Sequence, residues 1–352
     1  MALAYLLAEN VRCVARAELE LDARHNLIYG ENGSGKTSLL EAAFLLGRGR
    51  SFRTRNSERL IRHGESRLVA FGRTDATPPL TVGVQVARGE PTLAKVGGTE
   101  VQSLAELPAA LPIQVIEPRV HALLEEGSPR RRRWMDWAVF HVEHNFAADW
   151  SRYGRALKQR NAALRRDPRE ASAWESELAR LGERLARSRR SLLEQLHPHW
   201  LAMVRTLAGR EVTLHYAQGW PQDSTLAEAL EGSRPRDLQR GLTHMGPHRA
   251  DVHIRLEGRA AREILSRGQQ KVVAIAMILA QLTLLKALTG TSPTLLLDDP
   301  AAELDGARLA AFVAQIEALQ CQLIATSLTP ERGLFTHSER LFHVEQGRVK
   351  TL

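Results

Sequence analysis

Apolar and polar positions alternate in short runs near the start of the chain, which is typical of β-strands. Such runs are RAELELD (16–22) and HNLIYG (25–30), and a helical pattern, GKTSLLEAAFLLG, follows directly. The runs RLVAFGRT and LTVGVQVARG read as antiparallel strands because the turn-rich DATPP separates them, and LPIQVIEP reads as a further strand. This mixture predicts an α/β domain.

The pattern changes after Pro118, where helical spacing with many Arg and Glu continues to about Ala208. Strand-like runs return within DLQRGLTHMGPHRADVHIRLEG, and an apolar helix is expected over Gln270–Leu282. The strand PTLLLDDP, the helix DGARLAAFVAQIEAL, the strand CQLIATS and a terminal hairpin follow. We therefore expect one discontinuous α/β head, 1–117 plus 236–352 (lobe I), interrupted by a mainly helical arm, 118–235 (lobe II).

The composition fits a globular protein, with 352 residues of which 43% are hydrophobic. Cys13 and Cys321 lie in apolar runs that read as strands, so we expect two buried thiols and a reducing compartment. The N-terminus lacks a basic leader, and no apolar run reaches the eighteen or so residues that span a bilayer. The expectation is a cytoplasmic protein without a membrane partner.

Positive charge is concentrated in two regions of the chain. The segment from Arg119 to Arg210 holds 19 basic and 11 acidic residues, an excess equal to the net charge of +8 of the whole chain. A second excess lies between Arg48 and Arg73, with eight Arg against Glu58 and Glu65. This distribution favours a polyanionic partner such as nucleic acid, although solvated helix faces have the same composition.

The stretch GENGSGKT follows an expected strand and opens an expected helix, which is the setting of a phosphate-binding loop. Lys36 is placed to reach the β- and γ-phosphate oxygens of ATP, and the Thr37 hydroxyl to hold Mg²⁺. The alternative is an ordinary glycine-rich turn. The candidate nucleotide-binding residues here are Gly30, Glu31, Asn32, Gly33, Ser34, Gly35, Lys36, Thr37 and Ser38.

Two adjacent acids end the apolar strand in TLLLDDPAAELD. Asp298 is expected to hold Mg²⁺, as an Asp at the end of such a strand does in P-loop enzymes. Asp299 then lies next to the γ-phosphate, where a carboxylate can orient or deprotonate the attacking water. The alternative is that the pair only caps the following turn.

A second anion cradle is predicted at LSRGQQK, before the apolar helix. Ser266, Gly268 and Gln269 offer a hydroxyl, an unobstructed backbone and an amide at the positive end of the helix dipole. Because the phosphate loop, Mg²⁺ and the acids already surround the nucleotide in the same chain, we expect the cradle to contact the partner's nucleotide in a two-fold dimer.

These motifs, in this order, resemble the phosphate loop, signature motif, Walker B strand and D-loop of an ABC-type ATPase head. More narrowly, GRGRSFRT, VIEPRVHALLEEGSPRRRRWMDWAVFHVE and GPHRADV resemble the RecF family of bacterial recombination mediators over nearly the whole chain. The resemblance implies a head related to those of SMC proteins, an ATP-dependent homodimer and slow ATP hydrolysis. It also implies binding to gapped, junction and double-stranded DNA near the nucleoid, and RecA loading together with RecO and RecR.

The same resemblance suggests two further site residues. Gln114 becomes a candidate sensor of Mg²⁺ and the γ-phosphate, although a polar residue in a strand can also be an ordinary outward-facing one. Asp305 matches the D-loop acid that reaches across the dimer. Ala302 and Ser34 depart from the family, which usually has Ser and Gln there, and Thr326 with Ser327 stands where a transporter ATPase has a switch His.

Arginines supply the candidate DNA contacts. Four consecutive Arg precede Trp134, Trp137 and Phe140, and we expect most of the four to face solvent or phosphate and the aromatic residues to lie in the core. The candidates are Arg130, Arg131, Arg132 and Arg133, then Arg48, Arg50, Arg53 and Arg55, and on the arm Arg152, Arg155, Lys158 and Arg160. His248 and Arg249 are singled out by the resemblance alone.

Two other functions remain open from the residues. The ATPase subunit of a membrane transporter needs a transmembrane partner and a switch His. A metabolic P-loop kinase gives no role to Ser266 or to the basic arm.

Overall fold

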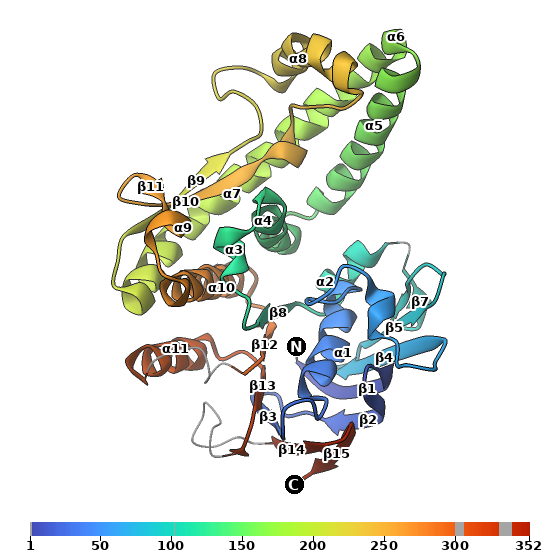
Figure 1. The fold of residues 1–352 in the computed structure, drawn as a ribbon, viewed down its shortest axis with the longest axis vertical. Coiled ribbons are helices and arrows are strands. Elements are labelled where there is room, and N and C mark those ends of the chain that lie inside the picture. Colours follow the sequence, from blue (N-terminus) through green and yellow to red (C-terminus); the bar gives the residue numbers. More distant parts are fainter. Residues whose placement is uncertain (1, 102, 300–305, 331–339) are drawn as a thin grey trace. The chain divides into compact units, whose positions relative to one another are not determined.

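A computed structural model describes residues 2–101, 103–299, 306–330 and 340–352 (Figure 1). The chain forms two compact units, 1–120 with 271–352, and 121–270. The first division lies close to the expected residue 117, but the structure places residues 236–270 in the second unit, whereas the sequence analysis assigns them to the head. The reason is that β10 (Asp251–Leu256) pairs with β9 (Val212–Ala217) of its own unit and not with a strand of the head.

The first unit contains an antiparallel sheet and a mainly parallel sheet. The antiparallel sheet has the order β2-β1-β4-β5-β6-β7, formed by Val14–Glu20, Leu3–Val11, Arg67–Thr74, Thr81–Ala87, Leu93–Val96 and Thr99–Glu100. The parallel sheet has the order β15-β14-β3-β13-β12-β8, formed by Arg348–Thr351, Arg340–Glu345, His25–Tyr29, Leu323–Ser327, Thr294–Leu297 and Ile113–Ile116. Its helices are α1 (Lys36–Arg48), α2 (Leu107–Ala110), α11 (Gly306–Leu319) and most of α10 (Arg267–Thr289). The α/β fold class predicted from the sequence is confirmed.

Helix α1 is buried on nearly all sides, because its apolar residues contact both sheets. Leu39, Leu40 and Leu45 belong to one core cluster with residues of the antiparallel sheet, such as Leu6, and of the parallel sheet, such as Leu296. Each fully buried Leu contributes about 1.5–3 kcal/mol relative to an exposed one. The start of α1 is therefore held firmly at the edge of the parallel sheet.

The parallel register brings the site-bearing strand ends to one edge. Strand β12 pairs in parallel with β8 and β13, and β13 pairs in parallel with β3. The segments that follow β3 and β12 are the phosphate loop and the acid pair, so both lie at the carboxyl edge of the same sheet, where open α/β sheets bind ligands.

Helix α10 is long and apolar enough by length and composition to cross a membrane, although the sequence analysis finds no apolar run of that length. In the structure 72% of its most apolar window is buried, which is what a core helix also shows. The helix carries Val273, Ala274 and Met277 into the protein interior.

The second unit is mainly helical. The helices α5 (Phe146–Arg166) and α7 (Glu175–Ala208) run side by side, with α8 (Leu226–Arg240) packed on α7 (Figure 1). A three-stranded sheet with the order β11-β10-β9 completes the unit. Its remaining elements are α3 (Ala122–Glu125), α4 (Ser128–Val142), α6 (Pro168–Ala171), β11 (Arg259–Ala260) and α9 (Ala261–Ile264).

The two cysteines differ in their surroundings. Cys321 is buried as predicted, and burial raises the pKa of its thiol to about 11. The prediction of a buried thiol is wrong for Cys13, which is exposed. Cys13 lies in the tight turn between β1 and β2 and not inside a strand.

Candidate nucleotide site

The phosphate loop leaves β3 at Tyr29 and enters α1 at Lys36. Two glycines permit this path. Gly30 has φ 154°, and a Cβ there would lie 2.2 Å from the Val344 carbonyl oxygen. Gly35 has φ 120°, and a Cβ there would lie 3.2 Å from Cys13 Sγ. The loop is therefore closely packed from below by β14 and by the β1–β2 turn, and only glycine fits at both places.

The Lys36 ammonium is held inside the loop by backbone carbonyls. Its Nζ donates to the Gly30 oxygen at 2.6 Å and to the Glu31 oxygen at 2.9 Å. Burial lowers the pKa of Lys36, and the nearby Asp299 and Asp298 oppose that shift. The two carbonyls therefore hold the ammonium inside the loop, and it is this Lys that contacts the β- and γ-phosphates in phosphate-binding loops.

Asp298 accepts two hydrogen bonds from hydroxyls of neighbouring elements. Thr37 Oγ1 donates to Asp298 Oδ1 at 2.9 Å, and Thr326 Oγ1 lies 3.1 Å from the same oxygen. Burial raises the pKa of Asp298, while both hydroxyls and the positive charge of Arg53 act in the opposite direction. A carboxylate beside a hydroxyl is a donor set that suits Mg²⁺, and a bound cation would compensate the cost of burying the charge.

The second acid is oriented by the same threonine. The Asp299 N–H donates to Thr326 Oγ1 at 2.9 Å, and Asp299 has the uncommon φ of 49°. A non-glycine residue in this region is uncommon and can mark functional strain. The sequence singles out Thr326 only because it stands where a transporter ATPase has a switch His, and no local pattern indicates that it bonds to both acids.

Gln114 does not reach this edge in the structure. It pairs with Leu295, three residues before Asp298, and its Nε2 donates to Gln281 Oε1 of α10 at 3.0 Å. Arg48 Nη2 donates to Gln114 Oε1 at 3.5 Å. Gln114 thus belongs to a buried polar cluster beneath the site, and its assignment as a γ-phosphate sensor has no support from its position.

The Ser34 hydroxyl is buried and has no hydrogen-bond partner within the described part of the chain, so a bound phosphate oxygen can satisfy it. Asp305 and Ala302 lie outside the described residues.

The predicted second cradle lies at the start of α10, in the second unit. Ser266 and Gln269 form a reciprocal cap: the Ser266 N–H donates to Gln269 Oε1 at 3.0 Å, and the Gln269 N–H donates to Ser266 Oγ at 3.4 Å. Ser266 and Gly268 are exposed, and a Cβ at Gly268 would have no atom within 4 Å. The cradle is therefore open to an outside ligand.

The four-arginine run is largely structural. Arg131 is buried, donates to both carboxylate oxygens of Asp251 at 2.7 and 2.8 Å, and also bonds carbonyls at the end of α3. Arg132 donates to the Ala250 oxygen at 2.6 Å, and Arg130 pairs with Glu126. The expectation that most of the run faces solvent is wrong, since only Arg133 is exposed.

The other candidate DNA-binding residues are likewise partly buried in ion pairs and partly exposed. Arg160 is fully buried and pairs with Asp237 and Glu175 inside the arm, because the α5–α7–α8 interface encloses it. Arg48 is also mostly enclosed, and burial lowers its pKa well below the usual value. The candidates that are exposed are Arg50, Arg53, Arg55, Arg152, Arg155 and Lys158. The prediction that the aromatic residues lie in the core is confirmed for Trp134 and Trp137, which are buried, whereas Phe140 is half-buried.

Comparison with known proteins places these observations in a family. The model of the RecF/RecN/SMC N terminal domain matches residues 2–351. The DNA replication and repair protein RecF of Vibrio atlanticus (strain LGP32) is 38% identical over 357 residues, covering 99% of each chain. RecF of Chromohalobacter salexigens is 42% identical over 339 residues, covering 93% of each chain.

Comparison with solved structures supports the same family. The structure of the recombination mediator protein RecF with ATP in the RecFOR pathway superposes with a TM-score of 0.90 at 26% identity, covering 100% of this chain and 97% of that one. An SMC head bound to the winged-helix domain of ScpA has a TM-score of 0.59 at 14% identity, which shows a shared fold only.

Proposed function

Because the chain belongs to the RecF/RecN/SMC N terminal domain family, and within it to the RecF proteins, we propose that it is an ATP-dependent DNA-binding mediator of recombinational repair. Two copies enclose each nucleotide between the phosphate loop of one protomer and the Ser266 cradle of the other. The dimer binds gapped, junction and double-stranded DNA and helps to load RecA together with RecO and RecR. It acts in the bacterial cytoplasm, associated with the nucleoid.

The observation that carries this proposal is the contrast between the two cradles. The phosphate loop is closed around Lys36 by its own carbonyls, whereas Ser266 and Gln269 bond to each other across an exposed corner, and Gly268 between them is exposed. An exposed helix start with its hydroxyl and amide already in place can contact the phosphates of a nucleotide bound to a second protomer. ATP then favours the dimer, because a ligand shifts an equilibrium by its differential affinity for the two states.

ATP hydrolysis is assigned to the acid pair, Asp298 and Asp299. Thr37 and Asp298 would hold Mg²⁺, which supplies charge neutralisation of the phosphates. Asp299 follows Asp298 directly and its N–H donates to Thr326, which supports a role for its carboxylate in orienting the attacking water. The reaction is a weak ATPase activity that dissolves the dimer.

DNA binding is assigned to the exposed arginines that follow α1. Arg50, Arg53 and Arg55 are all exposed, and Arg53 is close enough to lower the pKa of Asp298. DNA phosphates bound by this segment would therefore lie near the nucleotide site. Each such contact should contribute to the DNA affinity in a way that is independent of sequence and sensitive to salt.

The experiment is a sizing measurement by light scattering, with and without ATP, on the wild type, Ser266→Arg and Lys36→Met. The wild type should dimerise with ATP. Ser266→Arg should bind ATP but stay monomeric, and Lys36→Met should bind ATP so much more weakly that it stays monomeric at the same ATP concentration. Ser151→Arg, an exposed substitution on α5, is the matched control and should dimerise normally. A Ser266→Arg protein that dimerises like the wild type overturns the shared-nucleotide arrangement.

A further inference from the structure

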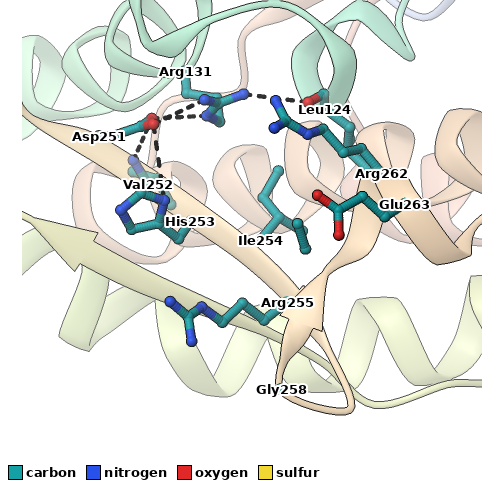
Figure 2. A pocket seen from close by; sticks show the side chains of 11 residues that line it. Leu124, Arg131, Asp251, Val252, His253, Ile254, Arg255, Gly258, Arg262 and Glu263 are labelled. Atoms are coloured by element: carbon teal, nitrogen blue, oxygen red, sulfur yellow. Dashed lines mark hydrogen bonds and ion pairs between the residues drawn. The ribbon is translucent and has the colours of Figure 1, made fainter.

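A pocket of about 390 Å³ lies entirely within the second unit, between β10, the turn after it, α9, and the ends of α3 and α4. Figure 2 shows the Arg131–Asp251 pair at one end of this pocket and Arg262 with Glu263 at the other, with Ile254 between them. None of the functions proposed above uses it.

One side of the pocket is a sheet edge. Strand β11 pairs only with Arg255 and Leu256 of β10, so no strand in the described part of the chain pairs with Asp251–Ile254 on that side. Arg132 covers the Ala250 carbonyl, which limits the open edge to the residues that line the pocket. The Val252 N–H already donates to Asp251 Oδ1 at 2.8 Å, so an added strand would bond to the remaining main-chain groups of this edge.

The floor and the rim of the pocket have different chemistry. Leu124, Val252 and Ile254 are buried and make an apolar floor. On the rim, Arg131 already neutralises Asp251 through two hydrogen bonds. Besides this pair, the residues that line the pocket include exposed Arg255 and Arg262 and one further acid, Glu263, so the lining retains an excess of positive charge.

We propose that this pocket is a docking site for an extended acidic peptide segment of a partner protein, which adds a strand beside β10 and sets a carboxylate against Arg262. A peptide backbone offers the N–H and C=O groups that a sheet edge requires, whereas a DNA backbone offers neither. The apolar floor likewise suits a side chain of the peptide and has nothing to contact a phosphate.

Helix α9, which forms one wall of the pocket, is bonded to the first turn of α10, next to the Ser266 cradle. Gln270 Nε2 donates to the Arg262 carbonyl at 3.2 Å and to the Leu265 carbonyl at 2.9 Å, and the Leu265 N–H donates to Ala261. A segment that presses on α9 therefore acts on the loop that carries Ser266. This consequence rests on the proposed function, but the docking does not.

The test uses two fluorescein-labelled peptides, Ile-Glu-Val-Glu-Ile and its amide counterpart Ile-Gln-Val-Gln-Ile, and follows binding by anisotropy. The acidic peptide should bind at least ten-fold more tightly than the amide peptide. Arg262→Glu should lose that binding by at least ten-fold. The control Arg259→Glu, an exposed residue of the same hairpin that does not line the pocket, should retain it.

A second readout reports on the sheet edge: hydrogen exchange of the β10 amides should slow when the acidic peptide binds. Equal binding of the two peptides, an equal loss in Arg259→Glu, no binding of the acidic peptide, or displacement of it by a 20-base-pair duplex in an Arg262-dependent manner would each overturn the proposal. ATP-dependent dimerisation is measured separately, so a failure of the proposed function leaves the docking result readable.

Discussion

The Thr37 hydroxyl donates a 2.9 Å hydrogen bond to Asp298 Oδ1, although 261 residues separate the two in the chain. The bond joins the first turn of α1 to the end of β12, and both are held by buried apolar packing. The packing of the fold therefore brings the two candidate Mg²⁺ ligands within hydrogen-bond distance of each other.

Replacing Asp298 by Asn should raise the stability of the ligand-free protein while weakening Mg²⁺-dependent nucleotide binding. Burial raises the pKa of Asp298 in the folded state, so its ionised form costs stability above that pKa, and the cost disappears as the pH falls through it. The melting temperature of Asp298→Asn should exceed that of the wild type at pH 8, with a smaller difference in acid. Thermal unfolding with and without Mg-ATP measures both effects, and exposed Asp223→Asn should change neither.

Removing the Lys36 ammonium should lower nucleotide affinity by about one to two orders of magnitude, because a charge-assisted hydrogen bond to phosphate contributes about 1.5–3 kcal/mol. Lys36→Met keeps the length of the side chain and removes its charge. Titration with a fluorescent ATP analogue gives the affinity, and Lys95→Met on exposed β6 is the matched control. An unchanged affinity in Lys36→Met would place the phosphates elsewhere.

The phosphate loop and the acid pair could be predicted from the sequence because their geometry depends on short segments with fixed spacing. Gln114 and Arg131 could not. The side chain of each is held by a partner far away in the chain. Gln114 bonds to Gln281, 167 residues away, and Arg131 bonds to Asp251, 120 residues away, and no local pattern encodes those contacts. The same holds for the domain limit near residue 236, since β10 has an ordinary strand pattern and only its pairing with β9 assigns it to the second unit.

The C-terminal hairpin of β14 and β15 should be needed for nucleotide binding, because its turn packs against the phosphate loop. The Gly347 N–H donates to the Ser34 carbonyl at 2.8 Å, and a Cβ at Gly347 would lie 2.4 Å from the Cys13 oxygen. Gly347→Ala should therefore lower both the melting temperature and the ATP affinity. Gly89→Ala, with a similar φ of 73° and open space around it, isolates the backbone cost and should leave ATP affinity unchanged.

Arg131 should matter for stability rather than for DNA. Truncation to Ala leaves the carboxylate of Asp251 without its bidentate partner at a site where both side chains are nearly enclosed, at 10% and 16% exposure. Breaking a buried pair in this way costs about 3–5 kcal/mol. Urea unfolding should show a loss of this size for Arg131→Ala and a much smaller one for exposed Arg133→Ala. A stable Arg131→Ala protein with weakened DNA binding would reverse the assignment.

The arm should lose stability in mild acid through one histidine. His248 Nε2 donates to the Thr243 carbonyl at 3.0 Å, which leaves Nδ1 to accept from the Tyr153 hydroxyl at 2.8 Å, so the ring is held neutral. Burial lowers the pKa of His248 to about 4, with smaller contributions from Arg249 and Arg132.

Because this pKa lies below that of an unfolded histidine, the unfolded chain binds more protons between pH 6.5 and about 4, and stability falls across that window as the pH decreases. The loss amounts to roughly 3 kcal/mol over the full window. His248→Gln retains a donor toward Thr243 and should show a flatter profile of unfolding free energy against pH, whereas exposed His63→Gln should follow the wild type. If His248→Gln reproduces the wild-type slope, the acid sensitivity belongs to other groups and the neutral Tyr153–His248–Thr243 chain does not limit the stability of the arm.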